Sequence, residues 1–173
     1  DGLGGFDAIV GNPPFLNQLE TVSAVSRAEA RLRRARFHGA VRGYADTSAA
    51  FMMLAYELCR EGGRIGFVMP QSLLTARDAA GVRQHLAERS SLRSLWLAGE
   101  HAFAASVYAC SLVLEEGCSE RVRCRVAGGL SFEEAKPVEV VGSALAEART
   151  WAPLAAGLAG VPDVAFEAAG ALG

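Results

Sequence analysis

The sequence predicts an α/β fold with a mostly parallel sheet and an antiparallel end. Apolar runs of strand length alternate with longer segments of helical periodicity, which is typical of strand–helix–strand units. Two late apolar runs are joined by only a short connection, which indicates antiparallel strands at one end of the sheet. Because active sites of such sheets lie at the carboxyl ends of the strands, the turns that follow the apolar runs are the first places to search for function.

The predicted elements follow one another in a regular order. A strand over 6–10 is followed by a loop and by a basic helix near 26–37. A second helix covers roughly 47–61, with Phe51, Leu54, Ala55 and Leu58 spaced three or four residues apart. The remaining elements are a strand over 64–69, a helix near 75–88, a strand over 92–97, and strands over 108–114 and 122–126 that are expected to pair with each other.

The composition describes one globular domain rather than a disordered or membrane-bound chain. The 173 residues are 51% hydrophobic and 21% charged, enough for one sizeable core. No run approaches the roughly 18 apolar residues that a membrane span needs, and no secretory signal opens the chain. The spacing of Cys59, Cys110, Cys118 and Cys124 does not match a zinc site, so we expect reduced thiols, no metal and a cytoplasmic location.

The most informative segment is Phe6-Asp7-Ala8-Ile9-Val10-Gly11 followed by Asn12-Pro13-Pro14-Phe15. Two prolines fix φ and leave this turn no N–H at those positions, and each proline also stiffens the residue before it. The turn can therefore hold the amide oxygen of Asn12 and the carbonyl oxygen of Pro13 as two aimed acceptors, with the ring of Phe15 beside them. Two acceptors and a flat apolar face suit a planar group that carries an –NH2.

This motif resembles the catalytic motif of the amino-group methyltransferases that use S-adenosylmethionine, and most of all the adenine-specific DNA methylases of restriction–modification systems, especially the large fused type (IIG-like). The resemblance continues in the family's order through about residues 5–117. It includes Tyr44-Ala45-Asp46 before a helix, the strand and turn that begin at Gly62-Gly63, and the late block that begins at Phe103.

The resemblance implies a partial Rossmann-like methyltransferase sheet and a defined reaction. Asn12 and Pro13 would accept hydrogen bonds from the adenine amine, on a turn completed by Pro14. Phe15 would stack on an adenine that has been flipped out of double-stranded DNA, and Phe103 is a candidate second stacking face, with an ordinary core phenylalanine as the alternative. In such a protein a recognition or nuclease region can follow in the same chain.

The segment from Arg27 to Arg42 is basic although the whole chain has a net charge of −2. It contains six arginines and a single acid, Glu29. Arg27, Arg31 and Arg34 follow helical spacing and would share one face. Since the planar guanidinium donates two hydrogen bonds to phosphate, we expect either contact with the DNA backbone or a solvated helix face.

The cofactor half of the resembled family lies upstream of the Asn-Pro-Pro-Phe motif and carries a glycine-rich loop and an acidic residue. Here Asp1-Gly2-Leu3-Gly4-Gly5 precedes a strand instead of joining a strand to a helix, so it is interpreted as a turn and the cofactor-binding residues are unknown. The chain is therefore expected to comprise a catalytic half over 1–130 and a connection toward a possible target-recognition region over 131–173, and to be inactive in isolation.

Two alternatives remain open at this point. One is a methyltransferase for another planar amine, such as a glutamine side chain or a guanine in ribosomal RNA, because such enzymes also carry Asn-Pro-Pro-aromatic motifs. The other is a remnant that binds DNA or a partner without transferring methyl groups.

Overall fold

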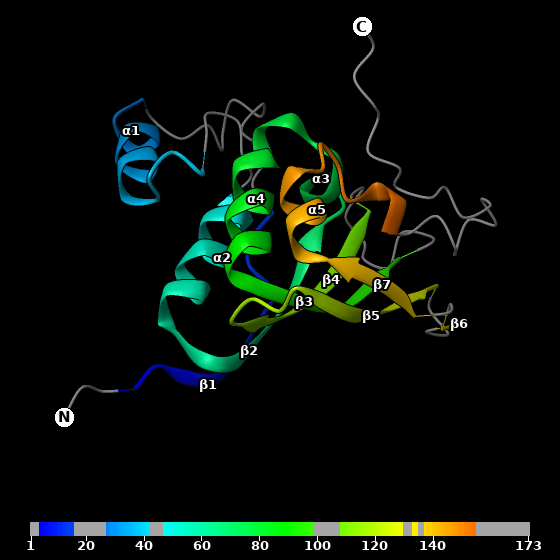
Figure 1. The fold of residues 1–173 in the computed structure, drawn as a ribbon. Coiled ribbons are helices and arrows are strands. Elements are labelled where there is room, and N and C mark those ends of the chain that lie inside the picture. The colour runs from blue at the N-terminus through cyan, green and yellow to red at the C-terminus, as the bar shows by residue number, and fades with distance from the viewer. Residues whose placement is uncertain are drawn as a thin grey trace, which may run out of the picture.

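A computed structural model shows a single mixed sheet with helices gathered on one side of it (Figure 1). It describes residues 4–15, 27–41, 47–98, 108–129, 133–134 and 137–154. The helices are α1 (Arg27–Arg36), α2 (Thr47–Leu58), α3 (Ser72–Thr75), a 3-10 turn η1 (Arg77–Ala79), α4 (Ala80–Arg89) and α5 (Gly142–Glu147). The strands are β1 (Phe6–Gly11), β2 (Cys59–Pro70), β3 (Ser90–Leu97), β4 (Ala109–Glu116), β5 (Arg121–Gly128), β6 (Glu133–Glu134) and β7 (Val138–Val141).

The sheet has the order β1-β2-β4-β3-β5-β6, and β7 pairs with β5. The β1–β2 and β3–β5 pairs are parallel, whereas β4 is antiparallel to both of its neighbours. Among the described strands, β1, β2, β3 and β5 therefore run in one direction, and β4, β6 and β7 run in the other. The predicted α/β class, with a mostly parallel sheet that includes antiparallel strands, is confirmed.

One predicted pairing is wrong. The strand after residue 108 was expected to pair with the strand over 122–126, but β4 lies between β2 and β3. Because both edges of β4 are already occupied, the chain crosses to the far side of β3, where β5 pairs in parallel. The short connection between β4 and β5 therefore joins strands that are not neighbours.

The core lies between the sheet and the helices. Alternate strand residues such as Ile65, Met69, Leu95 and Leu112 are fully buried on the helix side. In α2 the buried side is formed by Ala49, Met52, Met53 and Ala55. The expected positions Phe51 and Leu58 instead face outward, with 43% and 46% of their surface exposed.

Residues 137–154 pack on the same core. β7 pairs with β5, α5 packs on α4, and Trp151 is 1% exposed. The indole N–H of Trp151 donates to the carbonyl of Leu145 at 3.1 Å, and its backbone N–H donates to Leu74 at 2.8 Å. The division at residue 130 stays a prediction, but the elements over 137–154 belong to this core.

Candidate active site at the carboxyl end of β1

The Asn-Pro-Pro-Phe turn leaves the sheet directly at the carboxyl end of β1. β1 lies parallel to β2 with Gly11 opposite Phe67. A Cβ atom on Gly11 would lie 3.0 Å from the Cε1 atom of Phe67, so glycine at this position lets the buried Phe67 ring pack under the end of β1. The strand and the ring together set the point from which Asn12 projects.

Within the turn, burial alternates from residue to residue. Asn12 and Pro14 are exposed, Pro13 is buried and Phe15 is half-buried. The Asn12 side chain has no hydrogen-bond partner in the part of the chain that the structure describes. Its amide oxygen is therefore available to a ligand, while the buried Pro13 anchors the turn and restricts its motion.

The same edge of the sheet carries two residues that were not singled out from the sequence, Gln71 and Tyr108. The side-chain N–H groups of Gln71 donate to the carbonyls of Ala98 and Ala109, at 3.0 and 3.1 Å. Its backbone N–H donates to the carbonyl of Tyr108 at 2.8 Å. Gln71 thus joins the carboxyl ends of β2 and β3 to the start of β4. Only their places in the motif blocks that begin at Gly62 and at Phe103 could have drawn attention to Gln71 and Tyr108 from the sequence.

Tyr108 is an aromatic residue on the same edge as Asn12, with 51% of its surface exposed. It directly precedes β4, whose first residue Ala109 lies opposite Pro70 at the end of β2. The predicted stacking residue Phe103 lies outside the described residues, as do Tyr44 and Asp46. Within the late block that begins at Phe103, Tyr108 is therefore the aromatic residue that the structure describes at the candidate site.

Behind this edge, the buried Arg83 fixes α3, which follows β2. Its guanidinium donates to the carbonyls of Leu73, Ala76 and Arg149 at 2.9, 2.8 and 2.6 Å. Burial lowers the pKa of Arg83 from its ordinary value. The side chain holds the first turn after β2 against the segment that leads to Trp151, and so supports the site from below.

The basic helix α1 divides its arginines into two sets. Arg33 pairs with Glu29 at 2.7 Å and donates to Thr47 at 3.2 Å, and Arg36 pairs with Glu57 at 2.7 Å. Arg31 and Arg34 are exposed and have no carboxylate partner within the described ranges. The first set fastens α1 to α2, and the second remains available for an anion.

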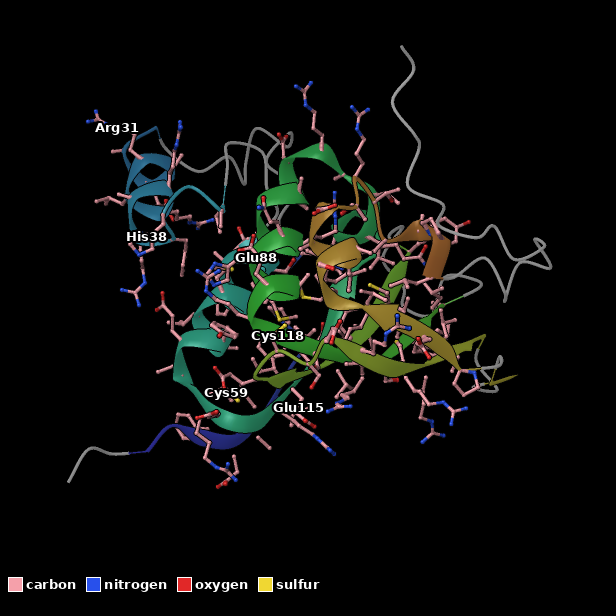
Figure 2. All side chains as sticks on the ribbon, viewed as in Figure 1. Arg31, His38, Cys59, Glu88, Glu115 and Cys118 are labelled. Atoms are coloured by element: carbon pink, nitrogen blue, oxygen red, sulfur yellow. The ribbon has the colours of Figure 1, made fainter. Side chains whose placement is uncertain are left out.

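Arg31 and Arg34 border an open depression of about 510 Å³ that is also lined by Ala35, His38 and Gly39. Figure 2 shows Arg31 on the outer side of α1, away from the sheet, and His38 at the other end of the helix. His38 and Gly39 adopt positive φ of 49° and 82°, which ends the helix and brings the imidazole into this face. Arg27 begins α1, and its side chain lies outside the description.

Elsewhere the described residues offer little other chemistry. No group of three or more His, Cys, Asp or Glu residues within them is placed to hold a metal ion. All four cysteines are free thiols, and burial raises the pKa of Cys110 and Cys124 to about 12. None of the described helices combines the length and apolarity that crossing a membrane requires.

Comparison with known proteins places this geometry in context. The model of the family described as Eco57I restriction-modification methylase matches residues 1–103. The chain is 25% identical over 113 residues to the type II restriction enzyme and methyltransferase RM.Eco57I of Escherichia coli, covering 64% of this chain and 11% of that protein.

Solved structures show the same fold. One is the type IIG restriction endonuclease BpuSI, with a TM-score of 0.52 and 22% identity over 70% of this chain and 15% of the other. Another is a class I S-adenosylmethionine-dependent methyltransferase from Listeria monocytogenes, with a TM-score of 0.55 and 14% identity over 74% of this chain and 38% of the other. The chain thus spans only a small part of the length of these relatives.

Proposed function

Because the chain belongs to the Eco57I restriction-modification methylase family, we propose that it forms the target-base half of an enzyme that methylates DNA. The proposed reaction transfers a methyl group from S-adenosylmethionine to the exocyclic amine of adenine. The observation that carries this proposal is the exposed amide of Asn12, which has no hydrogen-bond partner among the described residues, on a turn made rigid by Pro13 and Pro14 at the carboxyl edge of the sheet.

The acceptors in this turn explain how a poor nucleophile can be activated. The lone pair of an adenine amine is delocalised into the ring. Hydrogen bonds from its two N–H groups to the oxygens of Asn12 and Pro13 favour a pyramidal nitrogen whose lone pair is free to attack. Holding that nitrogen in one orientation supplies several kcal/mol of the acceleration through positioning alone.

The base must leave the duplex to reach the turn, since an amine inside a stacked helix is inaccessible. Phe15 is half-buried and follows the prolines, so one face of its ring can receive the flipped adenine. Such stacking contributes about 1–3 kcal/mol per base. Phe103 stays the proposed second stacking residue, and the exposed Tyr108 is an additional candidate on the same edge.

The exposed arginines of α1 supply a place for the DNA backbone. Arg31 and Arg34 lie three residues apart, border one depression and have no carboxylate partner within the described ranges. Their forked donors suit phosphate oxygens. We propose that this face, with Arg27 one turn earlier, binds the backbone beside the flipped base.

The glycines that precede β1 do not fit a cofactor-binding loop. Gly4 and Gly5 lie at the amino end of β1, at the opposite edge of the sheet from Asn12. A Cβ atom on Gly5 would lie 2.6 Å from the carbonyl oxygen of Leu58, so this glycine serves close backbone packing. No step of the reaction is therefore assigned to these residues as a cofactor site.

Substitution of Asn12 tests the proposal in the natural full-length protein. We expect Asn12→Ala to lower kcat/KM for DNA methylation by at least about 100-fold, as for loss of other aimed polar groups. Binding of S-adenosylmethionine and the unfolding temperature should remain close to wild type, because the side chain is exposed and makes no hydrogen bond to another described residue. Asn12→Asp, which keeps acceptor oxygens, should retain part of the activity. Unchanged turnover in Asn12→Ala would remove Asn12 from the mechanism.

A further inference from the structure

Gln71 directly follows β2 and joins three neighbouring strands at the edge of the sheet that carries Asn12. β2, β4 and β3 lie side by side in that order (Figure 1). The side-chain amide of Gln71 donates to the carbonyl of Ala109, at the start of β4, at 3.1 Å, and also to that of Ala98, directly after β3, at 3.0 Å. Its backbone N–H donates to the carbonyl of Tyr108 at 2.8 Å. One residue therefore holds the ends of both strands beyond β2.

The neighbouring Pro70 explains why a side chain is needed at this point. Pro70 lies opposite Ala109 but has no N–H to donate to β4. The amide of Gln71 supplies two donors there, and both are used. Gln71 also directly precedes α3, yet its side chain makes no capping hydrogen bond to that helix. Its polar group is therefore committed to the strand ends and not to the helix.

The hydrogen bonds of Gln71 set where Tyr108 stands relative to Asn12. β1 lies on one side of β2 and β4 on the other. The chain therefore leaves β1 and enters β4 at points roughly 10 Å apart, which is two strand spacings. Asn12 is exposed at the first point, and Tyr108 exposes 51% of its surface at the second. An aromatic residue whose backbone is held by Gln71 thus lies across β2 from the proposed base-binding turn.

Ser91 makes a comparable connection at the opposite edge of the sheet. It lies near the start of β3, donates to the carbonyl of Gly117 at 3.0 Å and accepts from the backbone N–H of Ser119 at 3.1 Å, both directly beyond β4. The same two strands, β3 and β4, are thus joined by one side chain at each end. Because Gln71 acts at the end that carries Asn12 and Ser91 at the other, the two residues separate a role at the site from a general structural role.

We propose that Gln71 is a positioning residue for the target base. By holding the ends of β3 and β4 to β2, it fixes the backbone of Tyr108, whose ring contacts the flipped base from the side of β4. Gln71 need not touch the base in this role, because it acts through Tyr108. The inference deepens the proposed function and rests on it, since it requires a base bound at Asn12.

Substitutions in the natural full-length protein test this role. Gln71→Met keeps the length of the side chain but removes both donors, and Ser91→Ala removes the two hydrogen bonds at the opposite edge. We expect Gln71→Met to lower kcat/KM for DNA methylation between about 10- and 100-fold, because small misplacements at an active site have effects of that order. Ser91→Ala should leave kcat/KM close to wild type, although both variants should lower the unfolding temperature. Gln71→Asn, which is too short to reach both carbonyls, replaces Gln71→Met if that variant does not fold.

Two further readouts distinguish positioning from a loss of stability. The fluorescent adenine analogue 2-aminopurine is placed in duplex DNA at the position that the enzyme methylates, and its emission rises when the base leaves the stack. Gln71→Met should weaken this rise, whereas Ser91→Ala should not. In a double-mutant cycle with Tyr108→Ala, Gln71→Met should have little further effect on kcat/KM, because the two residues act as a unit.

Wild-type turnover and fluorescence in folded Gln71→Met would overturn the inference, and so would equal losses of kcat/KM in Gln71→Met and Ser91→Ala. Losses from Gln71→Met and Tyr108→Ala that multiply in the double variant would show that Gln71 does not act through Tyr108. The proposed function has its own test in Asn12→Ala. Loss of transfer there, with full activity in Gln71→Met, would contradict this inference alone. Absence of methylated adenine with the wild-type protein would contradict the proposed function, and the inference with it.

Discussion

Asn12 and Pro13 show how neighbouring residues in one turn take opposite tasks. The buried Pro13 anchors the turn, and the exposed Asn12 is the residue that we propose binds the target amine. The sequence predicted a rigid turn with aimed acceptors because proline restricts φ whatever the surrounding structure. It could not predict that Gly11 makes room for the Phe67 ring, since that contact joins residues 56 positions apart (67 − 11) through the β1–β2 register.

A second residue-scale feature is the pair formed by His85 of α4 and Tyr56 of α2. Their rings meet edge to face with centroids 5.4 Å apart, and Tyr56 donates to Glu116 at 3.1 Å. Burial raises the pKa of Tyr56 to about 12. Burial, aided by Arg89, lowers the pKa of His85 below its ordinary value of 6.5, against the opposing charges of Glu88 and Glu57.

This shift predicts a pH dependence of stability. Because the folded state disfavours the charged imidazole, the unfolded state binds more protons below pH 6.5. The free energy of unfolding should therefore be highest above pH 6.5. It should decline as the pH falls from 6.5 toward the lowered pKa of His85 in the folded state. Urea titrations at several pH values should show a weaker decline in His85→Phe, which keeps the aromatic contact but cannot titrate. The same decline in both proteins would assign the effect to other groups.

At the scale of elements, α1 separates the arginines that form ion pairs from Arg31 and Arg34, which we propose contact DNA. Double substitution of Arg31 and Arg34 by alanine should reduce the slope of log K against log salt for DNA binding by roughly 1.8, as expected for two lost phosphate contacts at about 0.9 each. Arg33→Ala with Arg36→Ala is the matched control. Both of these residues are already paired, so their loss should loosen α1 while the slope changes less. Equal slopes for the wild type and the Arg31/Arg34 variant would show that these two arginines do not contact phosphate.

The order of helices and strands was predictable, because periodicity and turn residues act locally. The inward side of α2 was not. Its segment Thr47–Leu58 is apolar on almost every side, so three-to-four spacing fits Phe51 and Leu58 as well as Met52 and Met53. The partner of β4 could not be predicted either, since strand neighbours are chosen by packing across the whole sheet. The arginine spacing on α1 was visible, but not which arginines carry carboxylate partners.

At the scale of the whole molecule, the sheet continues past the predicted boundary at residue 130. Trp151 closes the core and connects α5 to the turn after β2. Trp151→Ala should lower the free energy of unfolding by about 3–5 kcal/mol, as expected for a buried large aromatic side chain. The exposed neighbour Ala152 supplies the control. Ala152→Ser should change the free energy of unfolding by less than about 0.5 kcal/mol. A small effect of Trp151→Ala in chemical denaturation would instead support a boundary before β7.

The described helices lie on one side of the sheet, and Gly5 at the amino end of β1 serves close packing against the backbone of Leu58. The motif order predicted a separate cofactor half. That separation stays a prediction.

The most direct test of the central claim identifies the methylated nucleoside. The natural full-length protein would be incubated with S-adenosylmethionine labelled in its methyl group and with duplex DNA of mixed sequence, and the DNA then digested to nucleosides. The account predicts label in N6-methyladenine, and its loss with Asn12→Ala. Label in another base, in protein or in RNA, or equal label in adenine with Asn12→Ala, would contradict it.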